Sequence, residues 1–180
     1  AGGRGAICEW PRRPRRAVVG GVMADGTFTL PIWFDHGATF AFALTGALAA
    51  IKRGYDIVGV FFLALVSSIG GGLIRDGVFI PSGAATPLLT DARYIELIVV
   101  ATIIGALFGG RLKRFHRVVP LIDAIGLGAY AAFGTQKALQ FDLAVHAAIL
   151  VGVINAAGGG LLRDILTREE PLVFRPGQFY

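Results

Sequence analysis

Residues 70–76, with the sequence GGGLIRD, decide the fold, because three glycines interrupt a long apolar run and an Arg-Asp pair follows within one helical turn. The pattern returns as GGGLLRD over residues 158–164, displaced by 88 positions at every matched residue. Each glycine costs roughly 0.8–1 kcal/mol relative to alanine inside a helix, so each triplet predicts a break or a sharp kink. An interrupted apolar helix that occurs twice indicates a membrane protein built by duplication.

The composition supports this class. Hydrophobic residues make up 54% of the 180 residues, charged residues only 16%, and the mean hydropathy is +0.66. Soluble domains carry about 25% charged residues. The net charge of +5 could suggest a nucleic-acid partner. The basic residues, however, lie in short loops between apolar segments and lack interleaved aromatic residues, so no nucleic acid is expected to bind.

The sequence has no pattern that predicts catalysis or tight metal binding. Cys8 is the only cysteine, which excludes an intrachain disulfide, and His36, His116 and His146 are scattered without metal-ligand spacing. Neither GxGxxG, GxxxxGK[ST] nor HExxH occurs. We therefore expect no enzyme activity, no cofactor and no tightly bound metal.

Five apolar segments approach the roughly 17–25 residues that a membrane-spanning helix needs. We expect them over residues 34–51, 57–80, 94–110, 118–136 and 143–166. Residues 1–33, which are basic and interrupted by prolines, are predicted to be a disordered tail or an extension foreign to the native protein. Residues 172–180 read as the approach to a sixth span, so the chain is expected to lack its sixth and seventh helices.

The offset of 88 residues aligns more than the glycine triplets. Asp35 matches Asp123 and Gly46 matches Gly134 without any gap. This predicts one three-helix repeat over residues 34–117 and a second, incomplete one over 118–180. Because three spans is an odd number, the repeats should be inverted, with a functional site near the midplane where they meet. The predicted fold class is all-α: a polytopic transmembrane helix bundle of two inverted three-helix repeats with glycine-broken second and fifth helices.

Loop charges predict the orientation. Loops 52–56, 111–117 and 167–175 fall on one side of the membrane and together hold eight Lys and Arg residues. By the positive-inside rule this side is cytoplasmic, so the chain would enter its first span from outside the inner membrane. The arginines of residues 1–33 conflict with this orientation.

The glycine triplets are the candidate ion path. A helix that ends at the glycines leaves carbonyls without donors, and these carbonyls and the negative end of the helix dipole attract a cation. The alternative is that the glycines only allow helices to cross closely. Thr45 and Asn155 are candidate polar pore-lining residues, with helix–helix hydrogen bonding as their alternative. The glycines of the predicted path are Gly70, Gly71, Gly72, Gly158, Gly159 and Gly160.

Each triplet is followed by charges at membrane depth. A charged side chain at a helix centre costs about 2.5–3.5 kcal/mol on insertion scales, so such groups usually face the bundle interior and pair. Counting crossings predicts an Asp35–Arg75 contact on the outer side and the matching contact on the inner side. The neighbouring aspartates compete for each arginine, and anchoring of span ends at the interface is the alternative. The matching contact in the second repeat is Asp123–Arg163. The competing aspartates are Asp76 for Arg75 and Asp164 for Arg163.

The chain resembles the prokaryotic trimeric intracellular cation (TRIC) channel family. The resemblance rests on FAFALTGALAAI at residues 40–51, the paired glycine motifs, and GLGAYAAFGTQKAL at 126–139, and it covers about residues 35–180. It implies two inverted repeats plus a seventh helix, homotrimers, and one cation pore in each protomer along the kinked second and fifth spans. Set against the family pattern, this sequence is expected to stop before the last two spans.

The function expected from these features is passive conduction of monovalent cations across the lipid bilayer, potassium in preference to multivalent ions. Lys137, expected in the connection between the fourth and fifth spans, is a candidate positive gate. The alternative is a secondary transporter of a small solute such as glycine, since some relatives of the family are called glycine transporters. A scaffold whose glycines only pack helices is a third interpretation.

Overall fold

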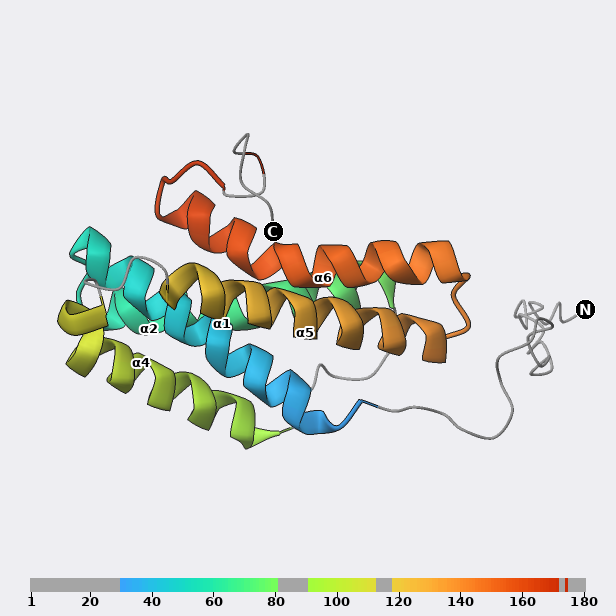
Figure 1. The fold of residues 1–180 in the computed structure, drawn as a ribbon, viewed down its shortest axis with the longest axis horizontal. Coiled ribbons are helices and arrows are strands. Elements are labelled where there is room, and N and C mark those ends of the chain that lie inside the picture. Colours follow the sequence, from blue (N-terminus) through green and yellow to red (C-terminus); the bar gives the residue numbers. More distant parts are fainter. Residues whose placement is uncertain (1–29, 81–90, 113–117, 172–173, 175–180) are drawn as a thin grey trace, which may run out of the picture.

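A computed structural model of the chain describes residues 30–80, 91–112, 118–171 and 174, and in these ranges all regular structure is helical. Apart from a short 3-10 turn at residue 174, it comprises α1 (Ile32–Arg53), α2 (Ile57–Ile74), the π-helical turn η1 (Arg75–Phe79), α4 (Ala92–Leu112), α5 (Val118–Gln140) and α6 (Val145–Leu166) (Figure 1). These helices agree with the five predicted spans to within a few residues. The predicted all-α bundle is confirmed. Of the tail predicted over residues 1–33, residues 1–29 lie outside the described residues, and the prediction is wrong for Ile32 and Trp33, which belong to α1.

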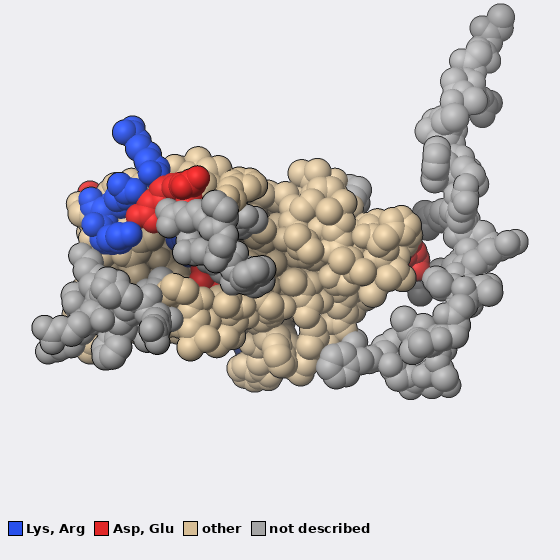
Figure 2. Space-filling model, turned by 45° about the horizontal axis from the view of Figure 1, so that its top comes forward, with Lys and Arg blue, Asp and Glu red and all other residues tan. Residues whose placement is uncertain are grey.

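The helices form a bundle suited to a membrane. In the part of the chain that the structure describes, four segments are long and apolar enough to cross a bilayer: Ile32–Arg53, Ile57–Phe79, Ala92–Gly109 and Val145–Leu166. Figure 2 shows charged side chains gathered mainly at one end of the face it presents, and most of the remaining described surface is uncharged. At one end of the bundle, Lys52 and Arg53 lie 2.9 and 3.4 Å from a carboxylate oxygen of Glu169.

The junction between α1 and α2 follows from three consecutive residues. Gly54 adopts a left-handed conformation (φ 77°), and its N–H donates to carbonyls in the last turn of α1. Glycine takes this conformation without the steric cost that a side chain brings, which is why it commonly ends helices. Two residues later, Asp56 caps α2 by accepting a hydrogen bond of 2.8 Å from the N–H of Gly59.

Helix α1 is the central element, and it contacts α2, α4, α5 and α6 (Figure 1). Its small residues allow this, since Ala43, Ala47 and Ala50 are fully buried and present only a methyl group to their neighbours. Small residues at helix interfaces let backbones approach closely, which drives packing where lipid competes for apolar surface.

The two repeats are inverted, as the contacts between α2 and α6 show. A Cβ added to Gly71 would lie 1.9 Å from the carbonyl oxygen of Asn155, and one added to Gly159 would lie 2.1 Å from that of Ser67. Exchanging the repeats by 88 positions turns the first contact into the second. Because residue numbers rise along α2 as those of their partners fall along α6, the helices cross antiparallel. The two helices are therefore related by a local pseudo-twofold axis at this crossing.

The glycine triplets do not interrupt the helices, contrary to the prediction of glycine-broken spans. Helix α2 continues through its triplet to Ile74 before the π-helical turn, and α6 continues to Leu166, although Figure 1 shows α6 changing direction along its length. The neighbouring helix, packed against the glycines, supports the helical backbone there. The predicted free carbonyl ends at the triplets are therefore wrong. The close-crossing alternative fits Gly70, Gly71, Gly158 and Gly159, against which the opposite helix packs, whereas an added Cβ at Gly72 or Gly160 would meet no atom nearer than 3.8 Å.

Candidate functional site

The crossing of α2 and α6 buries one polar side chain from each repeat at matched positions. Ser67 and Asn155 are both fully buried, and neither Ser67 Oγ nor Asn155 Oδ1 has a hydrogen-bond partner among the described residues. Asn155 Nδ2 donates to the carbonyl of Tyr130 at 2.8 Å, which fixes the amide. A buried polar atom without a partner costs about 1–3 kcal/mol, so such an atom calls for an explanation.

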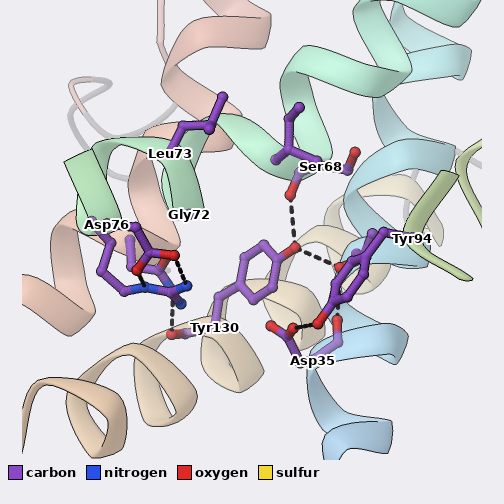
Figure 3. A pocket seen from close by; sticks show the side chains of 11 residues that line it. Asp35, Ser68, Gly72, Leu73, Asp76, Tyr94 and Tyr130 are labelled. Atoms are coloured by element: carbon purple, nitrogen blue, oxygen red, sulfur yellow. Dashed lines mark hydrogen bonds and ion pairs between the residues drawn. The ribbon is translucent and has the colours of Figure 1, made fainter. Parts of the chain in front are cut away.

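A cavity of about 40 Å³ opens beside this crossing, on the side of the first repeat. Figure 3 shows Asp35, Tyr94 and Tyr130 on one side of it and Ser68, Gly72 and Asp76 on the other. This volume has room for water or for a small ion, since one water needs roughly 10–15 Å³ by a comparable measure. The lining residues come from five helices and the π-helical turn: Asp35, Thr39, Ser68, Ile69, Gly72, Leu73, Arg75, Asp76, Tyr94, Tyr130 and Asn155.

A chain of hydroxyl groups runs along the cavity. Thr39 Oγ1 donates to the carbonyl of Asp35 at 2.8 Å, and Tyr130 Oη donates to the carbonyl of Ser68 at 2.7 Å. The two hydroxyl oxygens also lie 2.8 Å from each other. All three polar contacts are buried, so these oxygen atoms connect α1, α2 and α5 inside the bundle.

The acidic residues of the cavity have different partners. Asp35 is buried and accepts a hydrogen bond from the hydroxyl of Tyr94. Asp76 receives Arg75 Nε at 2.7 Å and Lys137 Nζ at 3.0 Å. Both cations therefore lie on Asp76, and the carboxylate of Asp35 contacts neither of them.

In the second repeat, the corresponding charges form a closed network. Arg163 Nη1 lies 2.7 Å from Asp123 Oδ1 and donates to Thr45 Oγ1 at 3.1 Å. Its Nε lies 2.9 Å from Asp164 Oδ1. Arg163 is only 5% exposed, so the guanidinium is enclosed by its partners. This arrangement holds α1, α5 and α6 together.

The structure brings together only part of the predicted charge pairs. The expected Asp123–Arg163 contact is present, whereas Arg75 pairs with the competing Asp76 and places its guanidinium 5.8 Å from the Phe133 ring centre. The reason lies at one matched pair of positions: Thr45 offers a hydroxyl to Arg163, and its counterpart Phe133 offers Arg75 a ring face. The predicted direct Asp35–Arg75 contact is wrong among the described residues.

The candidate pore residues differ in how they relate to the cavity. Asn155 and Gly72 line the cavity, whereas Thr45 belongs to the network around Arg163. Gly71 and Gly159 are covered by backbone atoms of the opposite helix and have no free surface toward the cavity. Lys137 lies in the last turn of α5 rather than in a connection, and it reaches the cavity through Asp76.

Sequence reasoning missed the aromatic and hydroxyl lining of the cavity. Thr39, Ser68, Tyr94 and Tyr130 looked like ordinary residues of apolar spans. The repeat itself contained a signal, because the offset of 88 places apolar Leu127, Ala156 and Phe42 opposite Thr39, Ser68 and Tyr130, respectively. A position that is polar in one repeat and apolar in the other marks a local departure from symmetry.

Known proteins are similar to this chain in sequence and architecture. A family model described as "Glycine transporter" matches residues 32–112 and 120–180. The chain is 34% identical over 150 residues to a UPF0126 membrane protein of Deinococcus radiodurans, covering 82% of this chain and 68% of the relative. It is 32% identical over 147 residues to the UPF0126 inner membrane protein YadS of Escherichia coli, covering 81% and 70%.

The fold is also that of a solved channel. The structure of the TRIC trimeric intracellular cation channel orthologue from Rhodobacter sphaeroides superposes with a TM-score of 0.75 at 32% identity, covering 80% of this chain and 73% of that one. The chain belongs to the TRIC channel family. It is a membrane protein, and the predicted resemblance is confirmed. In this TRIC-family chain, the cavity at the α2–α6 crossing is the candidate functional site.

Proposed function

We propose that this protein is a cation channel that conducts monovalent cations, principally potassium, passively through a pore within each protomer. The observation that carries the proposal is the cavity beside the α2–α6 crossing, which is lined by carboxylate and hydroxyl oxygens inside the helix bundle. Oxygen atoms can replace the hydration shell of an alkali cation, and a ring of such ligands is how pores conduct these ions. The similarity to solved TRIC cation channels supports the same function.

The proposed assembly is a homotrimer in the inner membrane. The similar channel from Rhodobacter sphaeroides is trimeric by its description, and the relative from Escherichia coli is an inner membrane protein. We place the chain's N-terminal side outside and loops 52–56 and 111–117 in the cytoplasm, because these loops carry the larger share of Lys and Arg.

The second candidate function is secondary transport of a small solute such as glycine. It is favoured by the description of the matching family model. Inverted repeats with a midplane site also suit alternating access. In this case the cavity would have to bind a zwitterion, and Asp76 with Arg75 would supply both signs of charge within 2.7 Å.

Purified protein in planar bilayers separates the two candidates. A channel gives unitary currents that are linear in voltage, and their reversal potential in a potassium chloride gradient lies toward the cation equilibrium potential. A transporter gives saturable uptake of labelled glycine into liposomes, with counterflow and without unitary currents. Counterflow of glycine together with the absence of unitary currents would overturn the channel proposal.

A further inference from the structure

The two repeats share a backbone arrangement but differ in the chemistry of one cavity. At three matched positions, the residue that lines this cavity has a hydroxyl group and its counterpart in the other repeat has an apolar side chain. These pairs are Thr39 with Leu127, Ser68 with Ala156, and Tyr130 with Phe42. Phe42 and Tyr130 also stack on each other with ring centres 5.2 Å apart, so they occupy equivalent places at the crossing. Duplication alone would give the same lining on both sides of the α2–α6 crossing. The hydroxyl groups are therefore a feature of this cavity and not of the repeat.

The hydroxyl chain has fewer protons than contacts. Thr39 and Tyr130 each have one hydroxyl proton, yet their oxygens make three short contacts, to the Asp35 carbonyl, the Ser68 carbonyl and each other. A hydroxyl is one donor with two acceptor lone pairs. When both protons point at the carbonyls, the two oxygens turn lone pairs toward each other at 2.8 Å. A positive charge beside them removes this repulsion.

Two further oxygens of the cavity point to a cation. Asn155 lines the cavity, is fully buried, and has an Oδ1 with no hydrogen-bond partner among the described residues. Asp35 is 6% exposed, and its contact in the cavity is the hydroxyl of Tyr94, because Arg75 and Lys137 are both engaged by Asp76. A carboxylate buried in a membrane-spanning bundle usually pairs with an opposite charge.

We propose that the cavity binds one partly dehydrated monovalent cation through oxygens of Asp35 and Thr39 from the first repeat and of Tyr130 and Asn155 from the second. We further propose that the symmetry-related side of the crossing forms no such site. The inference rests on the proposed cation conduction and assigns its ion a place. One carboxylate with neutral hydroxyl and amide oxygens matches a single positive charge. Ca²⁺ takes six to eight oxygens, commonly from several carboxylates, and the second carboxylate here is already neutralised by Arg75 and Lys137. In the second repeat, the counterpart of Asp35 is Asp123, and its carboxylate already forms an ion pair with Arg163.

The test measures ion binding independently of current. The thermal unfolding midpoint of the purified full chain is recorded against potassium chloride, with N-methyl-D-glucamine chloride keeping the ionic strength constant. A ligand that binds only the folded state raises the midpoint with its concentration. We expect a saturable rise with potassium and none with calcium at equal ionic strength. Equal midpoints in potassium and N-methyl-D-glucamine, or a larger rise with calcium, would overturn the site.

Variants locate the site. Asp35→Asn keeps the shape and removes the charge, and we expect it to raise the apparent potassium dissociation constant at least about tenfold. Tyr130→Phe and Thr39→Val each remove one hydroxyl and should raise the apparent potassium dissociation constant severalfold. If one of these variants does not fold, the other still tests the site. Ser67→Ala is the matched control, because it removes an equally buried, unpartnered oxygen that does not line the cavity. Wild-type potassium dependence in Asp35→Asn and in the folded hydroxyl variants would reject the site.

Failure of the site and failure of the channel remain distinguishable. Unitary cation currents in a protein without potassium-dependent stabilisation would leave conduction standing and reject the binding site. Potassium-dependent stabilisation that Asp35→Asn abolishes, in a protein without unitary currents, would support the site and reject passive conduction.

Discussion

Gly71 and Asn155 meet where the two repeats cross, and the Asn155 carbonyl oxygen lies 1.9 Å from the place a Gly71 Cβ would occupy. The matching contact joins Gly159 to the Ser67 carbonyl at 2.1 Å from the corresponding place. Real side-chain atoms do not approach backbone oxygens so closely, so the crossing exists only because both residues are glycine. The middle residue of each triplet therefore fixes the distance between α2 and α6.

Gly71→Ala and Gly159→Ala are expected to destabilise the protein. The added methyl group must push two backbones apart, and overpacking of this kind typically costs about 1–3 kcal/mol, occasionally more. The measurement is the thermal unfolding midpoint in detergent, read for each variant. Gly128→Ala is the control, since Gly128 is exposed on α5 with nothing within 4 Å of an added Cβ, and it should leave the midpoint unchanged or raise it. Equal midpoints for all three variants would contradict the packing role.

Removing Asp123 or Arg163 should cost far more stability than removing a surface charge. Breaking a buried ion pair by deleting one partner costs roughly 3–5 kcal/mol, because the other charge stays buried. Arg163→Met and Asp123→Asn are compared with Lys52→Met, whose ion pair with Glu169 has a lysine side chain 65% exposed. Exposed pairs contribute about 0–1 kcal/mol. Unfolding midpoints that fall equally in all three variants would mean that the buried network has no special role.

Sequence reasoning could predict the helices, the repeat and the Asp123–Arg163 pair, because each depends on periodicity, composition or the order of crossings. It could not predict that the triplets stay helical, since this depends on a helix from the other repeat packing against them. The Asp35–Arg75 error has a similar origin. Repeat symmetry requires Arg75 to act like Arg163, but Phe133 stands where Thr45 does, and Lys137 has no charged counterpart at Ala49. Side chains that differ between matched positions decide the site.

Lys137→Gln is expected to raise the unitary cation conductance at low salt. Lys137 Nζ lies 3.0 Å from the Asp76 carboxylate, so its removal leaves the cavity more negative and concentrates cations there. Charge focusing changes local ion concentration by about tenfold or more at low ionic strength. Conductance is measured from about 0.01 M to 1 M salt, over which the screening length falls from about 30 to 3 Å, so the two proteins should converge at the high end.

The control for this prediction keeps the positive charge. Lys137→Arg should conduct like the wild type at every salt concentration. A conductance increase in Lys137→Arg equal to that of Lys137→Gln would attribute the effect to altered packing of α5 and not to the charge.

Gly72→Ala and its repeat counterpart Gly160→Ala distinguish a cavity role from a helix role. Both positions accept a Cβ, because the nearest atoms are an arginine Nη2 at 3.8 Å in each case and, for Gly160, a Phe42 ring carbon at 4.0 Å. Both changes replace a helical glycine with alanine, and alanine is more favourable than glycine in a helix by roughly 0.8–1 kcal/mol. Only Gly72 lines the cavity of about 40 Å³. A methyl group there takes a share of this space similar to one water molecule.

We therefore expect both variants to unfold at or above the wild-type temperature, while only Gly72→Ala loses conductance. A rise of about 1.4 kcal/mol in the barrier at the narrowed cavity lowers the conduction rate tenfold. Unitary currents in planar bilayers, recorded for both variants at one salt concentration, give the answer. If Gly160→Ala lost as much current as Gly72→Ala, ions would have to pass through both halves of the crossing. The cavity beside Gly72 would then no longer be the narrow part of the path.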